Sequence, residues 1–135
     1  CDLAVALVDH AQVVSAFPDA QRTALRFRGG AYCGCNLYAF LTPASRRVAD
    51  FWSQVEQDRK RPWRIARALG WRPLLAYLTG RLSLEGTLRL LSDRLGVNIC
   101  PVILPFPDAA VDVDKPSDKD LAERILATRT GAAPT

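Results

Sequence analysis

The chain has 135 residues, which is enough for one domain or for part of one. Hydrophobic residues make up 49% and charged residues 24%, proportions of a globular protein that exclude a disordered chain. The net charge of +4 favours a phosphorylated or otherwise anionic ligand. Basic residues do not cluster as densely as in a nucleic-acid-binding arm, so we expect no nucleic-acid partner.

The cysteines and the apolar runs indicate the compartment. No two cysteines have the C-x-x-C spacing of a zinc site, and at this low density we expect reduced thiols without disulfides, as in the cytoplasm. No signal peptide and no apolar run of membrane-spanning length is recognisable. The chain enters an apolar strand almost directly after its first residue, which suggests either a cleavage product or a cut through a longer protein. The cysteines stand at Cys1, Cys33, Cys35 and Cys100.

The first 41 residues are predicted to form three strands, with a short helix after the first. The first strand is continuously apolar, as in a strand buried on both faces, and Asp9 can cap the helix that follows it. Gly29-Gly30 is a turn signal between the second and third strands, which predicts a hairpin. The predicted strands cover 3–8, 22–28 and 32–41, and the helix covers 10–17.

The central segment is predicted to be helical. Thr42 and Pro43 open the first helix as cap and first residue, and Gly96 ends the last one. Apolar residues at helical spacing predict a buried stripe on each of these two helices. The first stripe contains Val48, Phe51, Trp52 and Val55; the last contains Leu84, Leu88, Leu91 and Leu95; two short helices over 62–69 and 72–78 lie between them.

The final segment returns to strands and ends in a helix. We expect strands over 97–104 and 109–113, a helix over 116–126 and a flexible tail over 128–135. Strands alternating with helices, together with the hairpin, predict an α/β fold with a partial mixed sheet and flanking helices. Sheets of this kind bind ligands beyond the carboxyl ends of their strands.

Two carboxylates separated by one residue stand at the end of the last predicted strand. On a strand, Asp112 and Asp114 would point to the same side and could face one hard cation. Magnesium takes one or two protein carboxylates and fills its shell with water and substrate phosphates. In the alternative interpretation, the two aspartates only solvate a turn and cap the final helix.

The segments DVDKPSD (112–118) and GCNLYAF (34–40) resemble those of the MobA-like nucleotidyltransferases. This family is similar to the molybdenum-cofactor guanylyl- and cytidylyltransferases, and the resemblance extends from about residue 3 to 126. It implies the carboxy-terminal portion of a nucleotide-diphospho-sugar-transferase-like (glycosyltransferase-A-like) domain. It also implies that Asp114 ligates magnesium with Asp112 in support, that Asp118 is a helix-dipole partner, and that Asn36 borders the acceptor pocket.

The reaction implied by this resemblance transfers a nucleotidyl group from an NTP to an anionic small-molecule acceptor and releases pyrophosphate. The family's Gly-rich nucleotide loop is absent from this sequence, so we expect no turnover from this chain alone. Residues 1–127 would form the metal and acceptor half, completed by a missing amino-terminal half or by a second copy. No nucleophilic residue is required, and none is recognisable.

Several further residues have a functional and a structural interpretation. Asn36 either lines the acceptor pocket or satisfies backbone groups at a strand edge. Lys60 and Arg61 belong to a basic patch that could bind pyrophosphate or the acceptor, although a solvated helix junction explains the same charges. Trp63 and Trp71 are interpreted as core or lid packing. The patch comprises Arg59, Lys60, Arg61 and Arg64, and the single histidine, His10, is interpreted as a solvated or capping residue.

Two other classes of function fit the same sequence. One is a non-catalytic oligomerisation or interaction module that uses an exposed sheet edge. The other is a membrane-surface protein that uses the helices between residues 63 and 91, which are rich in Leu, Trp and Arg and poor in acids.

Overall fold

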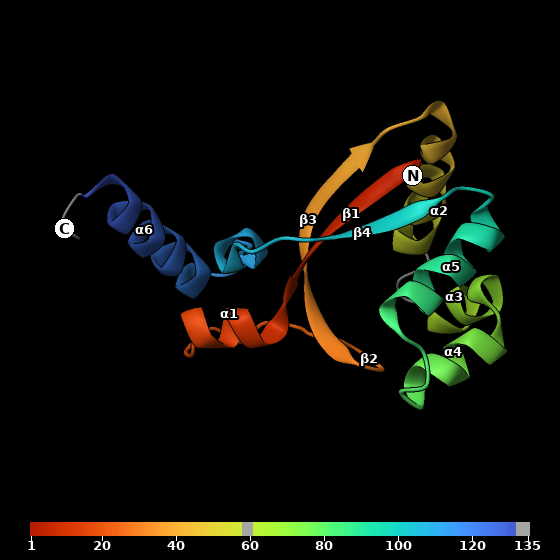
Figure 1. Ribbon diagram of the computed structural model, residues 1–135, viewed down its shortest axis with the longest axis horizontal. Coiled ribbons are helices and arrows are strands. Elements are labelled where there is room, and N and C mark those ends of the chain that lie inside the picture. Colours follow the sequence, from red (N-terminus) through yellow and green to blue (C-terminus); the bar gives the residue numbers. More distant parts are fainter. Residues whose placement is uncertain (58–60, 132–135) are drawn as a thin grey trace.

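A computed structural model describes residues 1–57 and 61–131. Its centre is a four-stranded sheet with the order β2-β3-β1-β4, and helices lie around it (Figure 1). Strand β1 pairs with β4 in parallel and with β3 in antiparallel orientation, so the sheet is mixed. The strands are β1 (Leu3–Asp9), β2 (Leu25–Phe27), β3 (Gly30–Phe40) and β4 (Ile99–Ile103). The predicted α/β class, with a partial mixed sheet and flanking helices, is therefore confirmed.

The helices fall into two groups along the length of the molecule. Figure 1 shows α2, α3, α4 and α5 at one end of the long axis, and α1 and α6 at the other. The 3-10 helices η1 and η2 precede α2 and α6 respectively. The bounds are α1 (His10–Ala16), η1 (Pro43–Ser45), α2 (Arg46–Gln57), α3 (Pro62–Leu69), α4 (Trp71–Leu78), α5 (Leu84–Leu95), η2 (Pro107–Ala110) and α6 (Pro116–Thr130).

Local capping signals set several of these bounds. The Asp9 carboxylate accepts a hydrogen bond of 2.7 Å from the backbone N–H of Ala11 and so caps α1. The Ser83 hydroxyl accepts one of 3.1 Å from the N–H of Gly86 at the start of α5. Gly96 ends α5 with a φ of 63°, a left-handed conformation that costs a glycine little. The predicted hairpin also forms, with β2 and β3 antiparallel around the turn before Gly30.

The hydrophobic core lies where α1 and η2 cover the sheet. Val8 of β1 and Val13 of α1 are almost fully buried there, and the thiols of Cys33 and Cys35 face them from the same side of β3. Ala110 of η2 completes the cluster. This core fixes the segment that follows η2 against the middle of β3.

Four predicted elements differ from the structure. The strand predicted over 109–113 is wrong, because Pro107–Ala110 forms the 3-10 helix η2 and the next residues pair with no strand. The strand predicted over 22–28 covers only Leu25–Phe27. Trp52 is exposed, so the predicted stripe of α2 is half-buried only at Val48, Phe51 and Val55. Helix α6 continues to Thr130, which makes the first residues of the predicted tail helical, while 132–135 lie outside the described residues.

Two tryptophans also depart from expectation. Trp63 of α3 is 58% exposed and Trp71 of α4 is 68% exposed, so the prediction that they pack in the core is wrong.

His10 is the first residue of α1, directly after its cap Asp9. Within the described parts of the chain, no helix has the length and apolar character needed to cross a membrane.

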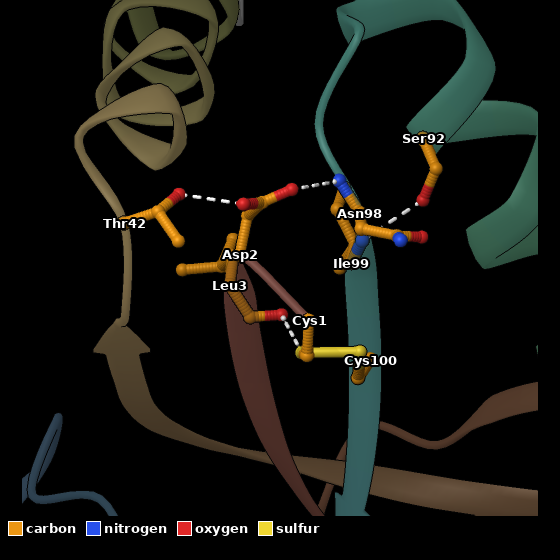
Figure 2. The surroundings of a disulfide bond; sticks show 8 residues. All are labelled: Cys1, Asp2, Leu3, Thr42, Ser92, Asn98, Ile99 and Cys100. Carbon is orange, nitrogen blue, oxygen red and sulfur yellow. Dashed lines mark hydrogen bonds between the residues drawn. A yellow bond between two sulfur atoms is a disulfide. The ribbon is translucent and has the colours of Figure 1, made fainter.

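A disulfide joins the start of the chain to β4, contrary to the expectation of reduced thiols. Cys1 and Cys100 are bonded with their Cα atoms 5.9 Å apart, within the usual range for a disulfide. Figure 2 shows Asp2 beside this bond, where its carboxylate bridges the segments after β3 and before β4. It accepts a hydrogen bond of 2.6 Å from the Thr42 hydroxyl and one of 2.9 Å from the N–H of Asn98. Together these contacts fasten the two residues before β1 to the start of β4 and to the segment that follows β3.

Candidate functional site

Asn36 lies at an irregularity in β3. Val5 of β1 faces Tyr38, but Leu7, two residues later, faces Gly34, so β3 carries extra residues between these pairs. Within this bulge Asn36 has a φ of 52°, a left-handed conformation that asparagine adopts more readily than most residues. The bulge re-aims the side chain, as bulges near functional sites commonly do.

The amide of Asn36 reaches the acidic segment predicted from the sequence. Its Nδ2 donates a hydrogen bond of 2.8 Å to Oδ2 of Asp112. The printed partner of this amide nitrogen is thus a side-chain carboxylate of the acidic segment. The contact joins β3 to the loop between η2 and α6.

Arg22, in the segment between α1 and β2, holds the same loop. Its Nη1 donates a hydrogen bond of 3.1 Å to the backbone carbonyl of Asp112. Its Nη2 lies 3.3 Å from Oδ1 of Asp118, and the two side chains are only 11% and 9% exposed. The Nε of Arg22 is also buried, and no acceptor for it is found among the described residues. A single guanidinium thus ties the loop to the first turn of α6.

Asp118 is fully occupied by these structural contacts. Its Oδ2 accepts hydrogen bonds from the backbone N–H groups of Asp114 and Lys115, at 3.2 and 3.1 Å. A carboxylate in this place satisfies donors at the start of α6 and interacts favourably with the helix dipole. The expected role of Asp118 as a helix-start residue is confirmed, and its oxygens are already engaged by protein donors.

Asp112 and Asp114 line a common cavity of about 420 Å³. Asp114 is exposed and Asp112 is half-buried, so both carboxylates can be reached from this cavity. A second hollow of about 540 Å³, between α6 and the segment after α1, shares lining residues with the first. The shared residues are Gln21, Lys115 and Asp118.

The core beneath the cavity is apolar. The pKa values of its two thiols depend on this burial and on charges in and near the acidic loop, the segment between η2 and α6. Burial raises the pKa of the Cys35 thiol, and the negative charge of Asp112 adds to this effect. Burial likewise raises the pKa of Cys33, although the nearby Arg22 guanidinium acts in the opposite direction. Both thiols are buried and therefore remain protonated at neutral pH, so they are poor candidates for nucleophiles or metal ligands.

The donor set around Asp112 and Asp114 suits only some metals. Among residues 1–57 and 61–131, no three His, Cys, Asp or Glu side chains come together as a metal-binding group. A zinc or calcium site built from protein ligands alone needs more donors than two carboxylates supply. Two carboxylates beside an open cavity match the requirement of magnesium, which keeps several waters and takes phosphate oxygens from its substrate.

The residues predicted to bind substrate are not all brought together. Asn36 and Asp112 are in direct contact, and Asp114 lines the same cavity as Asp112. Arg61 is the residue before α3, which Figure 1 places at the opposite end of the long axis from α6. Lys60 lies outside the described residues. Substrate binding by Lys60 and Arg61 stays a prediction.

The main residue that sequence reasoning missed is Arg22. It stands 90 residues before Asp112 and 96 before Asp118, at the start of the segment predicted to be a strand over 22–28. No local pattern indicates that this arginine, among the many in the chain, would turn toward the acidic loop. Only the fold brings the two segments together.

Comparisons with known proteins give one informative similarity. No protein-family model matches the sequence, and no curated protein matches it. Among solved structures, the chain is similar to a hypothetical transferase from Thermus thermophilus, with a TM-score of 0.76 and 35% sequence identity. The similarity covers 87% of this chain and 51% of the Thermus chain, so the chain spans about half the length of that protein. It therefore shares the fold of about half of a transferase structure.

Proposed function

We propose that this chain is the metal- and acceptor-binding part of a magnesium-dependent nucleotidyltransferase of the MobA-like type. The reaction would transfer a nucleoside monophosphate group from an NTP to an anionic small-molecule acceptor. In this proposal the fold corresponds to the carboxy-terminal part of a nucleotide-diphospho-sugar-transferase-like domain. The similarity to a hypothetical transferase supports the broader class, and the acidic loop supports the specific chemistry.

The observation that carries the proposal is the anchored pair Asp112 and Asp114 beside an open cavity. Asn36 of β3 and Arg22 of the segment before β2 hold Asp112, and Asp118 holds the backbone of Asp114. Several contacts therefore restrain a loop that has no regular structure of its own. Such preorganisation is needed where catalysis depends on the positions of charged groups.

The residues of the site have distinct roles in the proposed reaction. An oxygen of the acceptor attacks the α-phosphorus of the NTP, the bond from that phosphorus to the bridging β-oxygen breaks, and pyrophosphate leaves with the bonding electrons. Asp112 and Asp114 would hold magnesium, which neutralises phosphate charge when bound. Asn36 would keep Oδ2 of Asp112 in place while the carboxylate binds the metal. Lys115, beside the same cavity, offers a positive charge to an anionic group.

We infer that the NTP is bound mainly by residues that have no counterpart in this chain. The chain spans about half of the Thermus transferase, and its one Gly-Gly pair forms the turn before β3 rather than a phosphate loop before a helix. The anionic acceptor would then occupy the side of the cavity lined by Asn36's partner Asp112 and by Lys115. We propose that a missing amino-terminal half or a second copy of the chain would supply those residues.

The test of the proposal is metal binding and turnover in the full-length protein. Mn²⁺ replaces Mg²⁺ as a paramagnetic probe, and its binding is followed by the relaxation of solvent water protons. Replacing Asp114 with Asn should weaken Mn²⁺ binding by about tenfold or more, because one of two anionic ligands is lost. Magnesium-dependent release of pyrophosphate from NTPs should fall in parallel.

The matched control is Asp93→Asn, which removes an exposed aspartate of α5 far from the loop. It should change neither Mn²⁺ affinity nor turnover. If Asp114→Asn binds Mn²⁺ as tightly as the unaltered protein does, the metal assignment is wrong. If the unaltered protein and Asp93→Asn both fail to bind Mn²⁺ and to release pyrophosphate from NTPs, a non-catalytic interaction module becomes the better description.

A further inference from the structure

The α3–α4 segment combines a high positive charge with an exposed apolar surface. Between residues 61 and 81 the sequence contains no aspartate or glutamate, and every charged side chain there is an arginine. The described side chains of these arginines are exposed at the surface of the molecule. The arginines are Arg61, Arg64, Arg67, Arg72 and Arg81.

Helix α4 has two apolar faces, of which only one is packed. Its inner face carries Pro73, Leu74 and Tyr77, which line a hollow of about 330 Å³ together with residues of β2 and α5. The ring of Tyr77 meets that of Phe27 at 5.7 Å between centroids. The inner face is therefore sufficient to attach α4 to the protein.

The outer face of α4 is a stripe of three apolar residues one helical turn apart. Trp71, Leu75 and Leu78 are 68%, 53% and 70% exposed. Their spacing of four and three residues places them on one side of the helix. A lone exposed leucine needs no explanation, but an aligned stripe on a helix that is already packed on its other face indicates a contact surface.

Arginines flank this stripe and touch its aromatic ring. The guanidinium of Arg72 lies 5.5 Å from the ring centroid of Trp71, and that of Arg64 lies 5.6 Å from the ring of Trp63 on α3. An exposed tryptophan beside an arginine is a combination that suits the boundary between headgroups and acyl chains. There the ring enters the apolar layer while the guanidinium stays with the phosphates.

We infer that the outer face of α4, together with Trp63 of α3, binds the surface of an anionic lipid bilayer. The charge argues for lipid over protein, because a segment of five arginines without an acid is complementary to a dense layer of negative headgroups. The apolar stripe would enter the interface, and the helices would lie flat on it, since none in the described parts is able to span the membrane. The inference is independent of the metal site and of the reaction proposed above.

The experiment is vesicle flotation with the purified protein. One set of vesicles contains equal parts of phosphatidylglycerol and phosphatidylcholine, and the other contains phosphatidylcholine alone. The protein should float with the anionic vesicles at low salt, much less at high salt, and not with the neutral ones. The tryptophan emission should shift to the blue on binding, because exposed rings leave water.

Two variants and one control separate the contributions. The double change Leu75→Ser and Leu78→Ser should lower partitioning by about tenfold, since two exposed side chains lose their apolar surface. The double change Arg67→Gln and Arg72→Gln should lower it to a similar extent and reduce its dependence on salt. Leu126→Ser, which alters an exposed leucine of α6 at the other end of the molecule, should leave partitioning unchanged.

Three results would overturn the inference. They are equal flotation with neutral and anionic vesicles, no flotation with either, and unchanged partitioning in the leucine double variant. Size-exclusion chromatography tests the competing explanation, in which the stripe binds a second copy of the chain. A dimer that the leucine variant converts to a monomer, without lipid binding in either form, would assign the stripe to a second copy of the chain. Circular dichroism melting of each variant verifies that it remains folded.

Discussion

Arg22 and Asp118 form an ion pair of 3.3 Å between residues that stand 96 positions apart in the chain. The same guanidinium binds the carbonyl of Asp112, and the same carboxylate binds the backbone of Asp114. The acidic loop is therefore held by a pair of side chains that are themselves removed from most of the solvent. The position of the candidate metal ligands depends on this pair.

Replacing Arg22 with Ala should destabilise the protein by about 3 kcal/mol, because the Asp118 carboxylate would remain buried without its partner. Urea denaturation followed by circular dichroism measures this change. Arg26→Ala, which removes an exposed arginine of β2, is the control and should cost less than about 0.5 kcal/mol. Equal effects of the two changes would mean that the ion pair does not anchor the loop.

Asn36 allows the backbone and the side-chain contributions to be measured separately. Asn36→Gly keeps the left-handed conformation at φ 52° but removes the hydrogen bond to Asp112, whereas Asn36→Ala removes the bond and strains the backbone. The alanine variant should therefore be less stable than the glycine variant by about 1 kcal/mol. Their unfolding free energies from urea titrations give the difference. Equal stabilities would show that the bulge relaxes without cost.

The elements with local signals were predictable from the sequence. The hairpin follows from Gly29-Gly30, and α5 follows from the Ser83 cap, the leucine spacing and Gly96. These features depend on residues that are neighbours in the chain. The α/β class was predictable for the same reason, since alternating strand and helix patterns are each local.

The candidate site was predictable in composition but not in geometry. Apolar alternation around Asp112 favoured a strand, yet the carbonyl of Asp112 binds the guanidinium of Arg22 instead of a neighbouring strand. Asn36 reaches Asp112 only because β3 contains a bulge, and a bulge depends on the register between two strands. Both relationships arise from contacts between distant segments, which a pattern within one segment does not encode.

The stability of the protein should depend on pH through Asp2. Hydrogen bonds from the Thr42 hydroxyl and, to a smaller extent, from the N–H of Asn98 lower the pKa of this carboxyl below its ordinary value. The ionised Asp2 carboxylate therefore stabilises the folded protein fully above the pKa that an aspartate has in the unfolded chain, about 3.9. This stabilisation is lost as the pH falls through the lower pKa of Asp2 in the folded protein. Asp2→Asn should melt at a lower temperature than the unaltered protein at neutral pH.

This difference in melting temperature should narrow as the pH falls below about 4, because protonation removes the same charge from the unaltered protein. Thermal melts of both proteins over a series of buffers test the expectation. A gap that stays constant down to the most acidic pH would mean that the ionised carboxylate of Asp2 contributes nothing to stability. Asp93→Asn, at an exposed aspartate of α5, serves as the control without a gap.

The four cysteines should separate into one bonded pair and two protected thiols. Ellman's reagent should find no reactive thiol in the native protein, because Cys33 and Cys35 are buried and burial raises the pKa of both. Unfolding in denaturant without a reductant should expose these two, and reduction should release Cys1 and Cys100 as well. Four reactive thiols before reduction would contradict the disulfide. Because the bond spans a sequence separation of 99, its reduction should cost about 4.7 kcal/mol of unfolding free energy, and Cys100→Ser should reproduce that loss.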